Sequence, residues 1–175
     1  MAYAICGTAK EYLEGLCAVI DKVKAEEIDG LVDLLFETWK ADRAVLVFGN
    51  GGSAYTSSHF VTDLVKTAGV DGMRRLRAFS LVDNYGLTTA IGNDIDYDHT
   101  LIHPLESYGR PGDLALAISG SGNSPNVVAA CAWAKEHGLK LVCLTGFSGG
   151  EIGPMADLNV HIPSDNYGHV EDLHL

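Results

Sequence analysis

The chain has 175 residues, 47% of them hydrophobic, which is enough for one domain with a substantial core. The formal net charge of −11 argues against a surface for nucleic acid or acidic membranes, because no basic patch exceeds the short run Arg74-Arg75-Leu76-Arg77. We find neither an export signal nor an apolar span long enough to cross a membrane. The cysteines show no C-x-x-C spacing and predict buried or free thiols in a reducing, cytoplasmic compartment: Cys6, Cys17, Cys131 and Cys143.

Residues 1–42 carry two helical patterns. One apolar stripe runs from Tyr12 to Val23, and a second runs from Ile28 to Trp39. No strand precedes them, so these stripes must be buried against a later sheet or against a partner subunit. We favour the partner, because the first helix is amphipathic with few breakers.

Residues 43–175 alternate between strand and helix patterns. The predicted strands cover residues 44–48, 76–82, 114–118, 140–145 and 159–162. Helices are predicted from the first glycine-rich loop through Lys66, over 85–91 with a break at Gly92-Asn93-Asp94, over 97–108 and over 126–136. This alternation predicts a parallel sheet covered on both faces. Ligands in such sheets bind at the carboxyl ends of the strands.

A loop rich in serine follows the strand at 114–118. It reads Ser119-Gly120-Ser121-Gly122-Asn123-Ser124, and Pro125 takes the first position of the next helix. The helix N-terminus presents unpaired N–H groups and partial positive charge, which predicts a bound phosphate. A tight turn alone would need one cap, whereas three Ser and one Asn crowd six positions. The loop lacks the Lys of the nucleotide phosphate loop and the G-x-G-x-x-G spacing, so we expect a small phosphorylated metabolite.

Two titratable side chains share one face of the helix after the first glycine loop. His59 and Asp63 are four residues apart, a spacing that allows them to hold a metal together or to divide acid and base work. Taken alone, each also fits a partly exposed helix residue without a catalytic role.

Several ordered motifs resemble the sugar isomerase (SIS) domain family, within it the phosphoheptose isomerase branch. They are Phe48-Gly49-Asn50-Gly51-Gly52-Ser53, His59, Ala90-Ile91-Gly92-Asn93-Asp94, Gly109-Arg110-Pro111-Gly112-Asp113, Ile118 to Ser124, and Leu144-Thr145-Gly146. The resemblance implies one SIS domain over residues 1–175, with a flavodoxin-like three-layer sandwich around a five-stranded parallel sheet. It also implies a homotetramer with active sites between subunits, a divalent metal, usually zinc, and conversion of sedoheptulose 7-phosphate to D-glycero-D-manno-heptose 7-phosphate.

The resemblance also implies roles for individual residues. It implies that the sugar is contacted by Asn50, Gly51, Gly52 and Ser53. It places Asn93 and Asp94 at the reacting end of the sugar. It implies that the phosphate is bound by Ser119, Gly120, Ser121 and Ser124. Asp63 stands at the position of the base, with His59 and Asp94 as further catalytic candidates. The candidate metal ligands are His59, Asp63 and Glu171, and Glu171 also lines the substrate site.

Three positions depart from the family pattern, and a fourth family residue falls beyond the sequence. Asp63 stands where relatives have Glu, Glu171 where they have Gln, and Gly120 where they commonly have Thr. The shorter Asp63 draws the carboxylate back, and a shift of about 1 Å can cost about 10²-fold in rate. The family's acid histidine would fall one helical turn beyond His174, past Leu175, so we expect a natural tail there.

Three hypotheses remain open from the sequence. The first is a phosphoheptose isomerase, and the second is an isomerase of another phosphosugar. The third is a non-catalytic SIS protein that senses phosphosugars or binds a replication initiator. We favour catalysis, because His59, Asp63, Asn93 and Asp94 are all polar.

Overall fold

The computed structural model describes residues 8–175, and Cys6 lies outside them. Five strands form one parallel sheet in the order β2-β1-β3-β4-β5. Their bounds are β1 Ala44–Gly49, β2 Arg77–Ser80, β3 Leu114–Ser119, β4 Lys140–Thr145 and β5 Leu158–His161. The predicted five-stranded parallel sheet is therefore confirmed. Strand β2 is shorter than predicted, because it lies at the sheet edge and pairs with β1 over four residues only.

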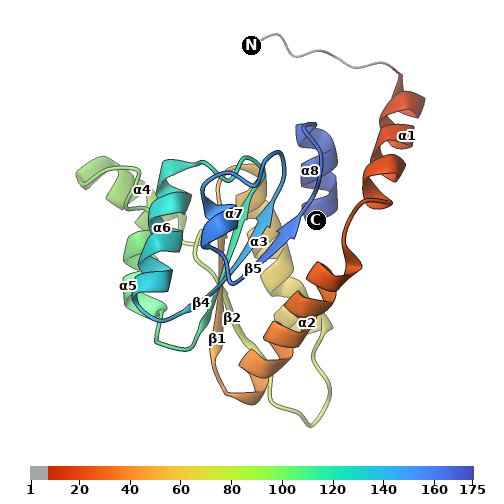
Figure 1. The fold of residues 1–175 in the computed structure, drawn as a ribbon. Helices are drawn as coiled ribbons and strands as arrows, with labels where there is room; N and C mark the ends of the chain where they lie inside the picture. Colours follow the sequence, from red (N-terminus) through yellow and green to blue (C-terminus); the bar gives the residue numbers. More distant parts are fainter. Residues whose placement is uncertain (1–7) are drawn as a thin grey trace.

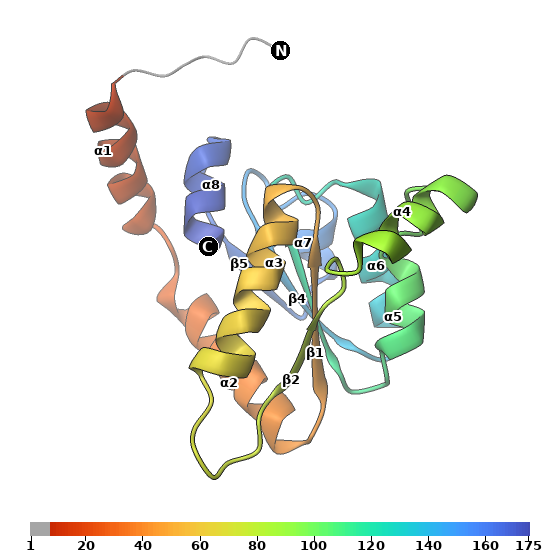
Figure 2. The same ribbon diagram turned by 180° about the vertical axis from the view of Figure 1, so that it is seen from behind.

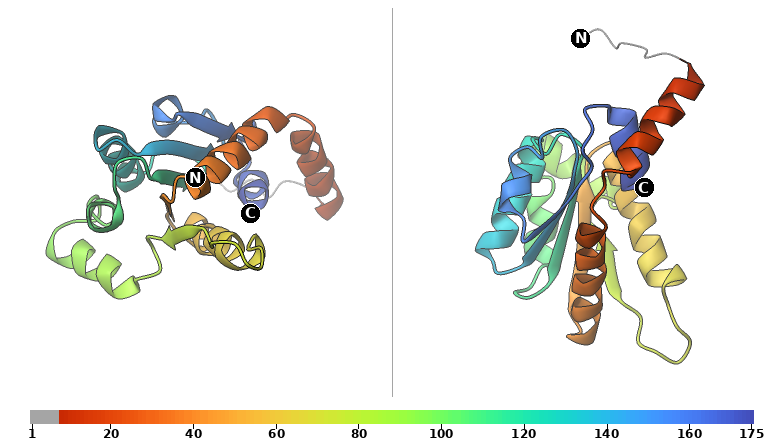
Figure 3. Two further views of the ribbon diagram at one scale, coloured as in Figure 1. Left: turned by 90° about the horizontal axis from the view of Figure 1, so that it is seen from below. Right: turned by 45° about the vertical axis from the view of Figure 1, so that its right-hand side comes forward.

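The helices cover both faces of the sheet, as Figure 3 (left) shows looking from below. On one face, alternate strand residues such as Leu46 and Phe48 pack against α5 and α6. On the other, Val45 and Val47 pack against α2 and α3. The helices are α1 Ala9–Ile20, α2 Ala25–Lys40, α3 Gly52–Thr62 with a π-turn η1 Asp63–Thr67, α4 Tyr85–Asp94, α5 Ile102–Tyr108, α6 Pro125–Glu136, α7 Ile152–Met155 and α8 Tyr167–His174 (Figures 1 and 2).

The two N-terminal helices differ in what they bury. Helix α2 lies on the sheet through Leu31, Leu34 and Leu35, so the preference for a partner was wrong for this stripe. Helix α1 instead packs against α8, where the Tyr12 hydroxyl donates to Asp172 Oδ2 at 2.6 Å. This hydrogen bond raises the pKa of Tyr12 to about 12.

The segment between β2 and β3 differs most from its prediction. Helix α4 continues through Asp94 instead of breaking at Gly92, since the Asn84 side chain caps its start and the Ile95 N–H still bonds to Ile91. The helix predicted over 97–108 begins only at Ile102. Turns occupy the preceding residues, and Pro104 falls within the first turn of α5, where proline is tolerated.

The described cysteines are all free. Cys131 and Cys143 are buried in the core, and Cys17 is exposed on α1. Burial and the neighbouring Cys143 raise the pKa of the Cys131 thiol, which keeps it protonated and unreactive. Within residues 8–175, no helix has the length and apolar character that a bilayer crossing requires.

Candidate active site

Two loops meet at the point where the strand order reverses. The first glycine loop (residues 49–53) follows β1, and the serine loop (residues 119–124) follows β3, the neighbouring strand. The helix that follows β1 lies on one face of the sheet, and the helix that follows β3 lies on the other. This arrangement creates the crevice in which such folds bind ligands. A Cβ atom on Gly49 would lie 2.6 Å from the Ile118 carbonyl oxygen, so the close approach of the two loops requires glycine there.

A pair of amides joins the first glycine loop to the start of α6, just after the serine loop. Asn50 Nδ2 donates to Asn126 Oδ1 at 2.7 Å, and Asn126 Nδ2 donates back to Asn50 Oδ1 at 3.0 Å. The Tyr97 hydroxyl also donates to Asn50 Oδ1, and Thr100 accepts from Asn126. The Asn50 side chain, predicted to contact sugar, is thus hydrogen-bonded within the protein. Sequence reasoning missed Asn126, whose only signal was its place just after Pro125.

The serine loop is held in one conformation by its own hydrogen bonds. Ser119 Oγ is buried and accepts from the Gly122 N–H at 3.2 Å, while Ser121 Oγ accepts from the Asn123 N–H at 3.3 Å. Ser124 caps α6 by position, but its hydroxyl makes no side-chain capping bond. Because accepting leaves a hydroxyl proton free, all three serines can donate to an anion in front of α6. The phosphate role of the loop stays a prediction.

His59 and Asp63 form the predicted pair. His59 Nε2 lies 3.4 Å from Asp63 Oδ2, and both side chains are more than half exposed, at 55% and 56%. Asp63 also accepts from the Thr67 hydroxyl at 3.0 Å. The π-turn η1 begins at Asp63, and such turns occur frequently at functional sites.

The third candidate metal ligand lies elsewhere. Helix α8 packs against α3 and places the Glu171 carboxylate over Gly52, where an added Cβ would be 3.2 Å from Oε1. His59 follows Gly52 by seven residues, about 10 Å along a helix. Residues 8–175 contain no group of three His, Cys, Asp or Glu side chains able to hold a metal ion. His59 and Asp63 therefore supply two ligands at most, and Glu171 faces the sugar side of the first glycine loop.

Asn93 and Asp94 are paired with each other. Asn93 Nδ2 donates to Asp94 Oδ1 at 2.8 Å on the last turn of α4. Helix α4 projects from the body of the domain, away from α3 (Figures 1 and 2). The two residues therefore do not join His59 and Asp63 within one copy of the chain.

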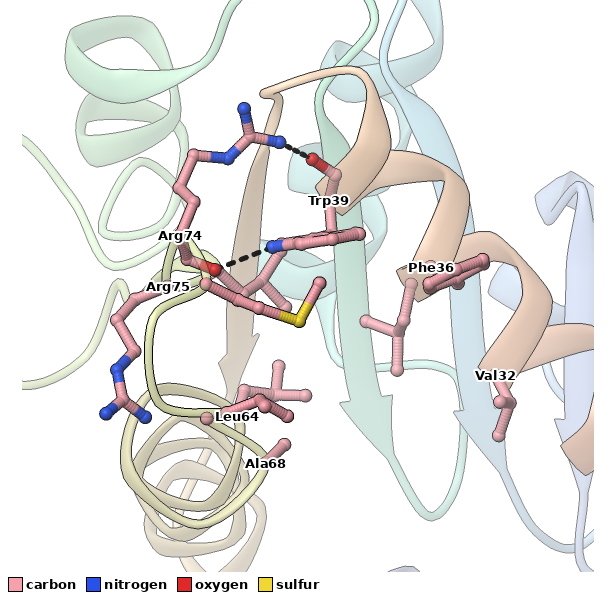
Figure 4. Close-up of a pocket in the computed structure, with 12 residues that line it drawn as sticks. Val32, Phe36, Trp39, Leu64, Ala68, Arg74 and Arg75 are labelled. Atoms are coloured by element: carbon pink, nitrogen blue, oxygen red, sulfur yellow. Dashed lines mark hydrogen bonds between the residues drawn. The ribbon is translucent and has the colours of Figure 1, made fainter.

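An apolar pocket lies at the opposite edge of the sheet (Figure 4). It has a volume of about 310 Å³ and is lined by α2, by η1 and by the segment before β2. Trp39 Nε1 donates to the Arg74 carbonyl at 2.8 Å across it. Because its walls precede β1 and β2, this pocket is separate from the loops that follow the strands.

His174 is a buried histidine behind the site. Neither ring nitrogen has a hydrogen-bond partner among the described residues. Burial lowers the pKa of His174 from 6.5 to about 4, and the nearby His161 adds to the shift.

We expect His174 to make the fold sensitive to acid. Its folded pKa is depressed, so the unfolded chain binds the extra proton first as pH falls below 6.5. The free energy of unfolding should drop by up to about 3 kcal/mol between pH 6.5 and pH 4. Urea denaturation at each pH would measure it. In His174→Leu the free energy of unfolding should change less between pH 6.5 and pH 4, whereas the exposed control His137→Gln should show the full drop. An unchanged drop in His174→Leu would show that His174 does not cause the acid sensitivity.

Similarity to known proteins identifies the family. The model of the SIS domain matches residues 10–146. A phosphoheptose isomerase from Citrifermentans bemidjiense is 35% identical over 169 residues, which cover 95% of this chain and 88% of the relative. The chain belongs to the phosphoheptose isomerase branch of the SIS domain family.

Solved structures of this branch share the fold. A phosphoheptose isomerase from Francisella tularensis superposes with a TM-score of 0.88 at 26% identity, covering 94% of this chain and 89% of that one. The enzyme from Neisseria gonorrhoeae gives 0.85 at 29% identity, covering 94% and 90%. The family and the α/β fold predicted from the sequence are therefore confirmed.

Proposed function

We propose that this chain is an aldose–ketose isomerase that converts sedoheptulose 7-phosphate to D-glycero-D-manno-heptose 7-phosphate through an enediol. The observation that carries this proposal is the serine loop, which lies where the strand order reverses. Its three hydroxyl groups precede the N-terminus of α6. Membership of the phosphoheptose isomerase branch supports the choice of sugar.

The isomerisation moves protons between adjacent carbons and oxygens. Asp63 removes a proton from C1 of the ketose, the C–H electron pair forms the C1=C2 bond of the enediol, and the C2 oxygen takes up a proton. The carboxyl group then returns its proton to C2, while the C1 hydroxyl loses its proton and becomes the aldehyde. His59, beside Asp63, carries the hydroxyl protons.

Binding of a divalent metal, zinc in the first instance, is a separate proposal. An imidazole and a carboxylate are ligands that zinc accepts, which favours His59 and Asp63. Glu171 lies apart from them, so we assign no step of the reaction to a metal. Elemental analysis of the purified protein, compared with His59→Ala, tests this point, and an equal zinc content in both would contradict it.

Assembly into a homotetramer with sites between subunits is likewise proposed. Apolar side chains on the outer faces of α1 and α2 support it, for example Leu13, Val32 and Phe36, each more than half exposed. Sedimentation equilibrium of the full chain tests the assembly. A cytoplasmic location is proposed from the free cysteines.

The direct test of function is an isomerase assay. Incubation of the chain with sedoheptulose 7-phosphate should produce the aldose D-glycero-D-manno-heptose 7-phosphate. NMR would follow its formation. Binding of the phosphosugar without turnover would instead favour the non-catalytic SIS alternative. Turnover of a different phosphosugar alone would favour the second isomerase hypothesis.

A further inference from the structure

An aromatic side chain covers the middle of the serine loop. A Cβ atom on Gly120 would lie 3.3 Å from Cε1 and 3.7 Å from Cδ1 of Tyr167. Cε1 is bonded to the ring carbon that carries the hydroxyl, so the edge of the ring that leads to the hydroxyl faces the loop. Gly120 is not among the glycines with positive φ. Its backbone therefore does not demand glycine, whereas an added side chain would press on the neighbouring ring and lie 3.5 Å from Val170 Cγ1.

Tyr167 is held in place from the loop that follows β4. Its ring packs on Phe147 with centroids 4.7 Å apart and planes at 59°. Phe147 itself has a φ of 50°, a conformation that non-glycine residues adopt at a cost and that occurs often at functional sites. The preceding residue, Gly146, donates its N–H to the Gly120 carbonyl at 2.8 Å. The aromatic pair and the serine loop therefore form one connected unit.

The hydroxyl of Tyr167 is free to bind a ligand. The residue is 55% exposed, and its hydroxyl makes no hydrogen bond to the part of the chain that the structure describes. Tyr12 and Tyr97, in contrast, donate to Asp172 and Asn50. A phenol beside an anion site acts as a hydrogen-bond donor.

The basic residues that flank the starts of β3 and β4 lie away from the serine loop. Arg110 precedes β3 and Lys140 begins β4, so both lie at the opposite edge of the sheet. A phosphate in the loop would thus be held by neutral N–H and O–H donors. Hydrogen bonds to an ionised acceptor are roughly twice as strong as neutral ones, so one further donor matters there.

We propose that Tyr167 is a substrate-binding residue whose hydroxyl donates a hydrogen bond to the phosphate group held by the serine loop. The inference rests on the proposed function and adds a residue that the family motifs did not indicate. In this chain the phenol occupies the space that a side chain at position 120 would fill.

The test removes the hydroxyl and keeps the ring. Tyr167→Phe should raise the Kd for sedoheptulose 7-phosphate about tenfold, the effect of losing one hydrogen bond to a charged group. KM should rise with it and kcat should stay unchanged, because the phosphate is bound alike in the ground and transition states. Binding of unphosphorylated sedoheptulose should not change. Tyr108→Phe is the matched control, since Tyr108 is 52% exposed and stacks on Phe79.

A second pair of variants tests the contact with Gly120. Gly120→Ala should weaken phosphosugar binding in the natural chain, because the added methyl group displaces the ring, but not in a Tyr167→Ala background. Independent, additive effects would overturn the contact. A wild-type Kd in Tyr167→Phe would overturn the inference and leave the proposed function intact. Failure of the natural chain to bind the phosphosugar would overturn both.

Discussion

Asp63→Asn is expected to lower kcat for sedoheptulose 7-phosphate about 10³-fold, while the Kd for the substrate stays within about twofold. A positioned general base contributes about 10²- to 10⁴-fold to rate, and an amide cannot accept the C1 proton. Because the side chain is 56% exposed and nearly isosteric with asparagine, the fold should be retained. The measurement is aldose formation by NMR, with binding followed by calorimetry.

Asp71→Asn is the matched control for this variant. Asp71 is an exposed carboxylate that pairs with Arg75 at 3.7 Å, at the opposite edge of the sheet from the serine loop. It should turn over substrate as the natural chain does. If Asp63→Asn retained full turnover, Asp63 would have no place in the mechanism. A large rise in Kd would instead assign Asp63 to binding.

Joint replacement of Ser121 and Ser124 by Ala should weaken binding of sedoheptulose 7-phosphate by about 10²- to 10³-fold. Each hydroxyl would donate to a charged phosphate oxygen, and such hydrogen bonds are worth about 1.5–3 kcal/mol each. The backbone N–H groups of the loop remain, so some binding should persist. Calorimetry with the phosphorylated and unphosphorylated sugar separates the phosphate contribution from that of the sugar.

Ser107→Ala serves as the control for the serine pair. Ser107 lies on α5, where its hydroxyl bonds to the His103 carbonyl within the helix. Its variant should bind the phosphosugar normally. Equal weakening of the phosphorylated and unphosphorylated sugars by the Ser121/Ser124 change would argue against an anion site in this loop.

The sheet and its loops could be predicted because they depend on local patterns. Continuous apolar runs such as 44–48 and 114–118 are typical of buried parallel strands, and the glycines after them locate the carboxyl edge. The boundaries between Gly92 and Ile102 could not be predicted, since a cap at Asn84 and the Ile95 backbone bond outweighed the glycine signal. The hydroxyl-rich serine loop and the His59–Asp63 pair could be predicted for the same local reason.

Other parts of the site depend on contacts between distant residues. Asn50 and Asn126 are 76 positions apart, and Tyr167 meets Gly120 only because α8 packs over the loops. No periodicity in the chain reports such contacts. The separation of Glu171 from His59 could not be predicted either. The spacing of residues along the sequence does not say which turn of α3 packs against α8.

The two interlocked amides at Asn50 and Asn126 bridge the crevice floor. Each amide both donates to and accepts from the other, so separating the first glycine loop from the start of α6 would break two hydrogen bonds at once. The first glycine loop and the start of α6 are consequently held at a fixed spacing, and any ligand in the crevice has to fit that spacing.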